Sequence, residues 1–244
     1  MTVNLYSGTP GSGKSLNVTR KILSALSSGH DVISNYPIVF KPREIKRGFA
    51  ARFFYVTEEY INVKNLAIFA KARGYIKKRK ESQCLVIIDE AGGRFNVEND
   101  KDEVKAMKDF FSDDNKVGEV KEYGAKDRKQ WRKFFSQHRK FGFDFILVAQ
   151  SDRMLDRQIR SMIEKEYVHR KAGNMFWWFH LLPFKIFVCV EKYYGLSMKT
   201  DTEFFIYRKS LGNRYDSMRL FDGYDYNDTE ESTIDCRAIF LPAQ

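Results

Sequence analysis

The chain has 244 residues, of which 43% are hydrophobic and 30% are charged, and its formal net charge at pH 7 is +10. The hydrophobic content is ample for a buried core, and the charge predicts an anionic partner: nucleic acid, an acidic membrane surface or nucleotide phosphates. Cys84, Cys189 and Cys236 are widely spaced and odd in number, so they support neither a disulfide framework nor a zinc site and favour a reducing, cytoplasmic setting.

The amino-terminal residues predict a strand, a glycine-rich loop and a helix, in that order. Val3 to Tyr6 has the composition of a short strand, and Ser15 to Leu26 carries apolar residues at helical spacing. Between them, Gly8 to Ser15 matches the phosphate-binding pattern G-x-x-x-x-G-K-S. Because the chain reaches this loop at once, we expect no secretion signal before it.

The loop pattern predicts a site for Mg-ATP. Its glycines let the backbone wrap closely, so that backbone amides and the amino end of the helix surround a polyphosphate. Lys14 is predicted to contact the β and γ phosphates, and Ser15 to hold Mg²⁺. No Asn-Lys-x-Asp sequence for guanine occurs, which favours ATP over GTP. The predicted nucleotide-binding residues are Gly8, Thr9, Pro10, Gly11, Ser12, Gly13, Lys14 and Ser15.

A second motif follows the continuous apolar run Cys84 to Ile88, which is typical of a parallel strand buried on both faces. Asp89 and Glu90 come directly after this strand, at the sheet edge where ligands bind in open α/β folds. This Walker B arrangement predicts that Asp89 binds the Mg²⁺ shell and that Glu90 orients or deprotonates the attacking water. The alternative is an acidic pair that is merely exposed at a strand end.

Other elements precede and follow the Walker B strand. Asp31 to Ser34 and Phe53 to Val56 are predicted strands, and Ala67 to Lys80 is a predicted basic helix. The basic cluster Lys77 to Lys80 at the end of that helix is a candidate contact for nucleic acid or anionic lipid, the alternative being a solvated helix face. Residues 98–130 are crowded with charged side chains and predict an exposed insertion. Trp131 to Arg139 has the pattern of an amphipathic helix.

The next strand, Phe143 to Val148, is followed by Gln150. We predict that the Gln150 amide senses the γ-phosphate or the lytic water from an adjacent strand, the alternative being an ordinary strand-end hydrogen bond. Arg157 and Arg160 lie in the next helix, and one of them, with Arg160 preferred, is a candidate arginine finger toward a neighbouring subunit. The alternative is a surface ion pair between Asp156 and Arg160, which are spaced i, i+4.

From Tyr167 onward the pattern changes to short aromatic-rich strands, among them Glu203 to Tyr207. The most apolar run, Met175 to Val190, is too short and too interrupted to span a membrane. It predicts a buried hairpin that turns at Pro183, with arms 176–181 and 186–190. Membrane insertion of this run is the alternative.

These elements predict an α/β fold with a mostly parallel sheet flanked by helices. The predicted core is 1–165, with the charged insertion at 98–130. A β-rich extension of the same domain follows at 166–222, and a flexible tail at 223–244.

The ordered motifs resemble those of the zonular occludens toxin (Zot) family, which includes the assembly ATPases of filamentous phages. The resemblance rests on Tyr6 to Ser15, Ile87 to Asn96, Phe135 to Gly142 leading into Gln150, and the later segments Leu155-Asp156, Ile159-Arg160 and Tyr215-Asp216-Ser217. It covers most of the chain up to about Phe221. The 96–131 segment is longer than is usual in that family, and the membrane-spanning segment that typically follows is not found.

The resemblance implies a RecA-like core related to HerA and FtsK-type motors. Lys14 and Ser15 then serve nucleotide and magnesium, Asp89 and Glu90 serve hydrolysis, and Gln150 senses the γ-phosphate. It also implies a homo-oligomeric ring, expected to be a hexamer, with phage coat or assembly proteins as partners. The chain is expected at the cytoplasmic face of the host inner membrane, which it contacts peripherally or through a partner.

Three functions therefore compete. The leading hypothesis is a Mg-dependent ATPase that powers the assembly and extrusion of filamentous phage. The second is a HerA/FtsK-type ATPase that translocates or packages DNA, which the basic charge also suits. The third is a nucleotide switch or membrane-assembly scaffold that does not hydrolyse ATP.

Overall fold

The computed structural model describes residues 2–78, 82–95, 128–174, 185–196 and 198–215. The predicted tail, 223–244, lies outside the described residues, as does the predicted charged insertion apart from its last three positions.

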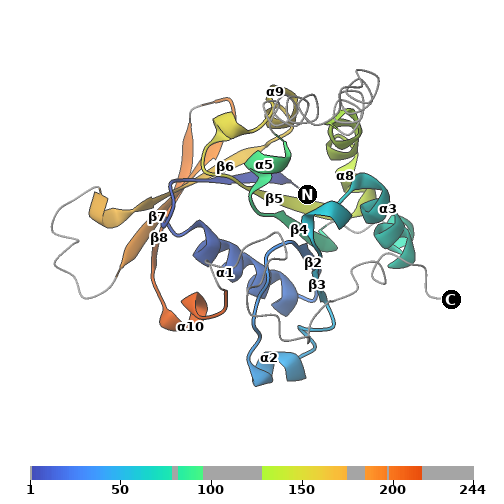
Figure 1. The fold of residues 1–244 in the computed structure, drawn as a ribbon, viewed down its shortest axis with the longest axis horizontal. Helices are drawn as coiled ribbons and strands as arrows, with labels where there is room; N and C mark the ends of the chain where they lie inside the picture. The colour runs from blue at the N-terminus through green and yellow to red at the C-terminus, as the bar shows by residue number, and fades with distance from the viewer. Residues whose placement is uncertain (1, 79–81, 96–127, 175–184, 197, 216–244) are drawn as a thin grey trace, which may run out of the picture.

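The described strands form one eight-stranded sheet in the order β3-β2-β4-β5-β1-β6-β7-β8 (Figure 1). From β3 to β6 all neighbours are parallel, and β7 runs antiparallel to both β6 and β8. The bounds are β1 Val3–Ser7, β2 Asp31–Ser34, β3 Phe53–Tyr55, β4 Cys84–Ile88, β5 Phe143–Val148, β6 Lys165–Lys171, β7 Ile186–Tyr193 and β8 Lys199–Ile206.

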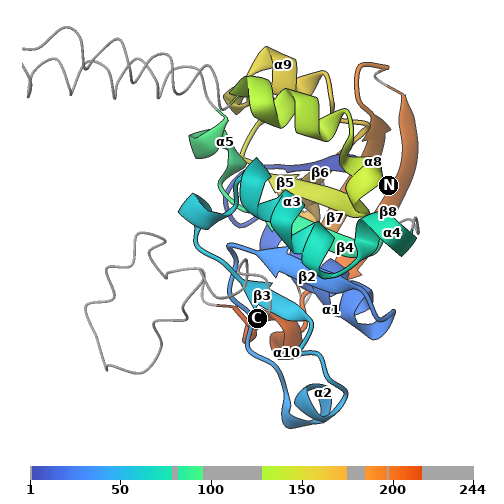
Figure 2. The ribbon, with the colours of Figure 1, turned by 90° about the vertical axis from the view of Figure 1, so that its right-hand side faces the viewer.

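Helices cover the two faces of this sheet, as Figures 1 and 2 both show. On one face lie α1 Lys14–Ser27 and α10 Lys209–Gly212, with α2 Pro42–Lys46 projecting beyond them. On the other lie α3 Val63–Ala72, α4 Tyr75–Lys78, α5 Ala91–Arg94, α8 His138–Phe141 and α9 Arg157–Arg160, together with helical residues 128–135. Short 3₁₀ helices are η1 Glu58–Tyr60, η2 Asp152–Met154 and η3 Ala172–Asn174.

Side chains of the central strands alternate between two cores. In β5, Phe143 and Phe145 pack in the core beneath α3 with Trp131, while Ile146 packs in the core beneath α1 with Ile22. Successive strand residues point to opposite faces, so a strand covered on both faces needs apolar residues throughout. This explains why β4 is a continuous apolar run and why β5 is apolar apart from Asp144.

The first helix and the strands at 31–34, 84–88 and 143–148 are confirmed. The single helix predicted from Ala67 to Lys80 is wrong, because α3 ends at Ala72 and α4 begins at Tyr75. Gly74 lies between them with φ +72°, a left-handed conformation that ends a helix. The helix predicted from Trp131 to Arg139 is likewise interrupted at 136–137.

The predicted hairpin is also wrong in its pairing. Strand β7 exists, but its two edges pair with β6 and β8. No edge of β7 is therefore free to pair with an arm at 176–181. That arm itself lies outside the described residues. Among the helices that the structure describes, none combines the length and apolar character needed to cross a membrane.

Candidate nucleotide site

The carboxyl ends of β1, β4 and β5 meet at one edge of the sheet, where β5 lies between the other two strands. A pocket of about 210 Å³ opens at this edge. It brings together side chains from chain segments that are far apart in the sequence. Its lining is Pro10, Gly11, Lys14, Ser15, Tyr36, Asp89, Glu90, Val148, Ala149, Gln150 and Tyr215.

The glycine loop joins β1 to α1 and forms one wall of the pocket. Gly8 has φ +143°, and a Cβ atom there would lie 2.4 Å from the backbone oxygen of His169. Gly13, the N-cap of α1, has φ +93°, and its added Cβ would lie 2.8 Å from the Phe187 ring. Both positions therefore require glycine for conformation and for space. Of the eight predicted loop residues, Pro10, Gly11, Lys14 and Ser15 line the pocket. The other four, Gly8, Thr9, Ser12 and Gly13, belong to the loop but are not part of the pocket lining.

The Lys14 side chain lies back over the loop. Its Nζ donates to the backbone oxygens of Gly8, at 2.5 Å, and Thr9, at 3.2 Å. Burial lowers the pKa of Lys14, while the nearby carboxylates of Asp89 and Glu90 act in the opposite direction. The ammonium group is thus held in the pocket by carbonyl oxygens and faces the two acidic side chains.

Asp89 is held by a residue that the sequence did not single out. Asn35, directly after β2 and 4% exposed, donates from Nδ2 to the Asp89 backbone oxygen at 3.0 Å. Its Oδ1 accepts from the Asp89 backbone nitrogen at 2.7 Å. Burial raises the pKa of the Asp89 carboxyl to about 6, and the nearby Lys14 acts to lower it. A cation in the pocket would stabilise the ionised carboxylate.

Glu90 has a left-handed backbone with φ +54° and is exposed. Its backbone nitrogen donates to Asp89 Oδ1 at 3.1 Å, and its backbone oxygen accepts from Gly93 at 2.8 Å. Left-handed backbone is unfavourable for a residue with a side chain and is concentrated at functional sites. This turn places Asp89 and Glu90 on the same pocket.

Gln150 follows β5 and lies between the Walker A and Walker B strands, as predicted for a residue on an adjacent strand. Its side chain is exposed at the pocket, and its backbone oxygen accepts from Gly8 at 3.1 Å. Gln150 is therefore tied to the start of the glycine loop. The sensing role of its amide stays a prediction.

Two tyrosines complete the pocket, and neither was predicted as a site residue. The Tyr36 hydroxyl lies 3.1 Å from Thr19 Oγ1 and donates to the Ser15 backbone oxygen at 3.4 Å. The Tyr215 ring packs on the Tyr36 ring at 5.5 Å between centroids. Tyr215 begins the Tyr215-Asp216-Ser217 segment, which contributed to the family resemblance but was given no chemical role.

His169, in β6, hydrogen-bonds to the end of β1, just before the glycine loop. Its Nδ1 donates to the Ser7 backbone oxygen at 3.2 Å, and its Nε2 accepts from Asn17 Nδ2 at 2.9 Å. Burial lowers the pKa of this imidazole to about 4, so the neutral ring joins β6, β1 and α1. Sequence reasoning found no role for His169, because its two partners are more than a hundred positions away.

The pocket fits a magnesium-bound nucleoside triphosphate. Among the described residues, Ser12 Oγ is buried in the loop without a hydrogen-bond partner, and it is available to a ligand. Ser15 and Asp89 would offer a bound Mg²⁺ the oxygen ligands that it prefers. The Lys14 ammonium supplies a cation beside the glycine loop.

Arg160 lies outside this pocket, in α9 on the other face of the sheet. Its Nη1 lies 4.0 Å from Asp152 Oδ2. The alternative pairing with the Asp156 side chain is wrong, since Asp156 Oδ1 instead accepts from the Gln158 backbone nitrogen at the helix start. Arg157 is exposed. Neither arginine lines the pocket of its own chain.

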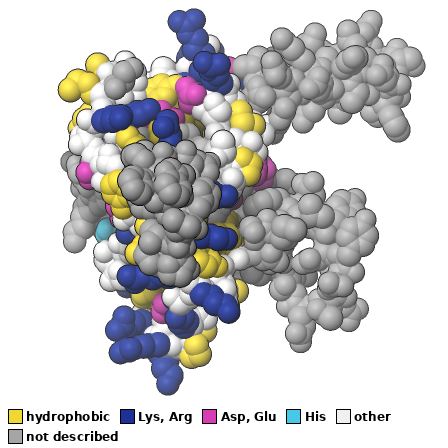
Figure 3. Space-filling view, turned by 90° about the vertical axis from the view of Figure 1, so that its left-hand side faces the viewer, with side chains coloured by type: hydrophobic (Ala, Val, Ile, Leu, Met, Phe, Trp, Pro, Cys, Tyr) yellow, Lys and Arg dark blue, Asp and Glu magenta, His cyan; other side chains and the backbone are white. Residues whose placement is uncertain are grey.

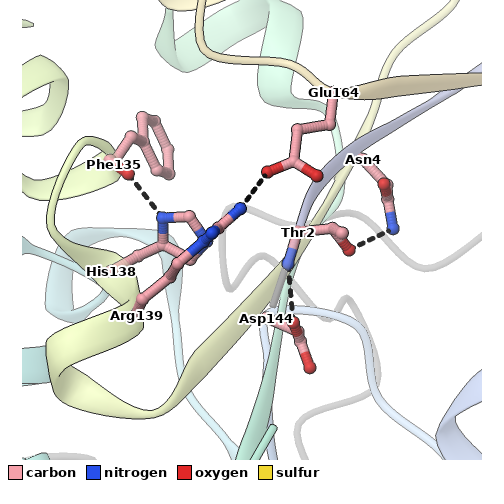
Figure 4. A network of polar contacts seen from close by, with 7 residues as sticks. All are labelled: Thr2, Asn4, Phe135, His138, Arg139, Asp144 and Glu164. Atoms are coloured by element: carbon pink, nitrogen blue, oxygen red, sulfur yellow. Dashed lines mark hydrogen bonds and ion pairs between the residues drawn. The ribbon is translucent and has the colours of Figure 1, made fainter. Parts of the chain in front are cut away.

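His138, at the start of α8, faces the core. It is 5% exposed, and its Nδ1 donates to the Phe135 backbone oxygen at 2.5 Å (Figure 4). The neighbouring Arg139 pairs with Glu164 at 2.9 Å. Both residues precede β5, whereas the pocket lies beyond its other end.

The mostly parallel sheet, the glycine loop between β1 and α1, and the acidic turn after β4 define a P-loop NTPase fold. The profile described as zonular occludens toxin (Zot) matches residues 2–213, so the chain belongs to the Zot family.

Solved structures with similar folds include the N-terminal domain of zonular occludens toxin from Neisseria meningitidis, with 17% identity over 88% of this chain and 98% of that chain and a TM-score of 0.45. B204, the DNA-packaging ATPase from Sulfolobus turreted icosahedral virus, has 14% identity over 82% and 95%, with a TM-score of 0.47. The flagellar accessory protein FlaH from Methanocaldococcus jannaschii has 11% identity over 85% and 84%, with a TM-score of 0.43. A search of curated proteins found no match.

Proposed function

We propose that this chain is a Mg²⁺-dependent ATPase motor that powers the assembly of filamentous phage and its extrusion through the host envelope. The observation that carries the hydrolytic part is the convergence of Lys14, Ser15, Asp89, Glu90 and Gln150 on one pocket. Membership of the Zot family supports the part that concerns phage.

Each pocket residue has a distinct task in this proposal. With a nucleotide bound, Lys14 would leave its carbonyl partners and neutralise charge on the β and γ phosphates, and Ser15 and Asp89 would hold Mg²⁺. Bound Mg²⁺ supplies charge neutralisation to the phosphate oxygens. Glu90 accepts the proton of the attacking water, and the Gln150 amide orients that water or the γ-phosphate.

The motor is proposed to act as a homo-oligomeric ring, a hexamer, at the cytoplasmic face of the inner membrane. In such a ring Arg160, or Arg157, stabilises the transition state from the neighbouring subunit. Both arginines lie outside the pocket of their own chain, which suits a role in trans. Coat or assembly proteins of the phage are the proposed cargo.

The chemical part is tested with two variants and a matched control. Lys14→Ala removes the charge that faces the phosphates, so we expect it to lose most Mg-ATP binding in calorimetry. Glu90→Gln keeps that charge and is expected to bind ATP but not to turn it over. Lys21→Ala, an exposed lysine of the same helix, is expected to behave as the parent. Parent-like ATP affinity in Lys14→Ala would refute the nucleotide site.

The cargo is tested separately, by recovering proteins with the Glu90→Gln chain from phage-producing cells in the presence of ATP. Enrichment of coat or assembly proteins over the Lys14→Ala chain supports phage extrusion. Turnover that instead rises on addition of DNA, without such enrichment, replaces it with a DNA-translocating motor. Stable Mg-ATP binding with no turnover in the parent replaces it with a scaffold.

A further inference from the structure

Between β2 and β3 the chain leaves the body of the protein and forms α2. Figures 1 and 2 both place α2 at the far end of the molecule, away from the sheet. None of its residues is buried. We call residues 39–47 the α2 projection.

The α2 projection combines exposed cations with exposed aliphatic side chains. Val39 is 69% exposed and Ile45 is 53% exposed, although both are large and apolar. Figure 3 shows Lys and Arg side chains gathered at this lower end of the molecule, with apolar side chains beside them. The exposed cations of the projection are Lys41, Arg43, Lys46 and Arg47.

The one acidic residue of the projection, Glu44, forms an ion pair with Arg214. Arg214 is 7% exposed and donates from Nη1 and Nη2 to the two Glu44 oxygens, at 2.6 and 2.8 Å. The Lys41 backbone nitrogen also donates to Glu44, at 3.0 Å. The Arg214 hydrogen bonds hold the pKa of Glu44 below its usual value, so its charge stays paired. The exposed charge of the projection is therefore positive throughout.

The aromatic rings of this region are engaged in the fold. Phe40 packs edge-to-face on Phe49 at 6.3 Å and on Phe53 at 5.4 Å. Proteins that bind single-stranded nucleic acid usually pair their cations with exposed aromatic rings on which the bases stack. The α2 projection instead exposes aliphatic side chains, which enter the boundary between lipid headgroups and acyl chains, next to cations that bind lipid phosphates.

We propose that the α2 projection docks on the surface of a membrane that contains anionic phospholipid. Lys41, Arg43, Lys46 and Arg47 attract the headgroups, and Val39 and Ile45 enter the interface. This inference goes beyond the motor function and does not depend on nucleotide hydrolysis.

The test uses the full 244-residue chain and phospholipid vesicles in a flotation assay. We expect binding to vesicles with about 30% phosphatidylglycerol to exceed binding to pure phosphatidylcholine, and to weaken as salt is added. Arg43→Gln with Lys46→Gln is expected to lower the affinity by about fivefold for each cation removed, hence about 25-fold. Ile45→Asn is expected to weaken binding at constant charge.

Lys64→Gln with Lys71→Gln is the matched control, because it removes the same charge from exposed positions on α3. Only the α2 variants should lose vesicle binding while keeping the parent's thermal melting temperature. Equal loss in the α3 control would show that net charge alone acts, and unchanged binding of Ile45→Asn would show that the apolar side chains do not insert. Either result overturns the proposal, as does binding of single-stranded DNA, but not of vesicles, that the α2 variants abolish.

Discussion

Replacing Asn35 by alanine tests whether the Walker B aspartate depends on a partner from a neighbouring strand. The Asn35 side chain closes a two-hydrogen-bond ring with the backbone of Asp89, at 2.7 and 3.0 Å. It is 4% exposed, so water does not readily replace it. Asn35→Ala removes both hydrogen bonds and leaves the Asp89 N–H and C=O without their side-chain partner.

The expected loss of stability follows from those two groups. Each backbone group that loses its partner in a buried setting costs about 1–3 kcal/mol. Asp89 itself is only partly buried, so the lower part of that range applies and the total is about 2–4 kcal/mol. Residues that orient a metal ligand typically contribute about 10- to 100-fold to metal affinity. Mg²⁺-dependent ATP binding should therefore weaken by a similar factor.

Urea unfolding and calorimetric titration with ATP, with and without Mg²⁺, measure the two effects. Asn62→Ala serves as the control, because Asn62 caps α3 through a 2.9 Å hydrogen bond from the Asn65 nitrogen, away from the pocket. It should lower stability by about 1 kcal/mol and leave Mg-ATP affinity unchanged. If Asn35→Ala is destabilised but binds Mg-ATP as the parent does, Asn35 holds the fold and not the site.

Three further outcomes are expected. Gly8→Ala should lower the melting temperature and weaken ATP binding, because its Cβ would lie 2.4 Å from a backbone oxygen; an unchanged melting temperature would contradict this. His169 is neutral in the fold, because burial lowers its pKa from 6.5 to about 4. The unfolded state therefore binds more protons below pH 6.5, and the free energy of unfolding should fall by up to about 3 kcal/mol as the pH drops from 6.5 toward 4. His169→Gln should flatten that dependence in urea unfolding, and an equal slope in both proteins would exclude His169 as its source. A Glu90→Gln chain mixed with an Arg160→Ala chain should regain turnover if Arg160 acts across a subunit boundary; co-assembly without turnover would count against it.

Local patterns predicted much of this molecule. The glycine loop and the Asp89-Glu90 turn are contiguous in sequence, and each chemical role follows from residue type and from its place after a strand. Gln150 was found in the same way, since it follows β5, a strand that is apolar apart from Asp144. The break at Gly74 was missed, although glycine after a helical stretch is a common helix end.

What escaped prediction depends on contacts between distant segments. Asn35 and Asp89 are 54 positions apart, and nothing near Asn35 in the sequence marks it as a partner of a carboxylate. The hairpin prediction assumed that β7 pairs with the residues just before it. In the structure β7 pairs with β6, whose aromatic and β-branched residues identify a strand but not its partner.

The last described residues connect the two surfaces of interest. The Arg214 side chain holds Glu44, and its backbone oxygen accepts from the Val39 nitrogen at 2.9 Å, so Arg214 contacts both the helix and the first residue of the α2 projection. The next residue, Tyr215, packs on Tyr36 in the wall of the nucleotide pocket. One peptide bond therefore separates the residue that holds the α2 projection from a residue that lines the pocket. The proposed membrane surface and the proposed ATPase site lie at different places on the protein, and the consecutive residues Arg214 and Tyr215 contact one each.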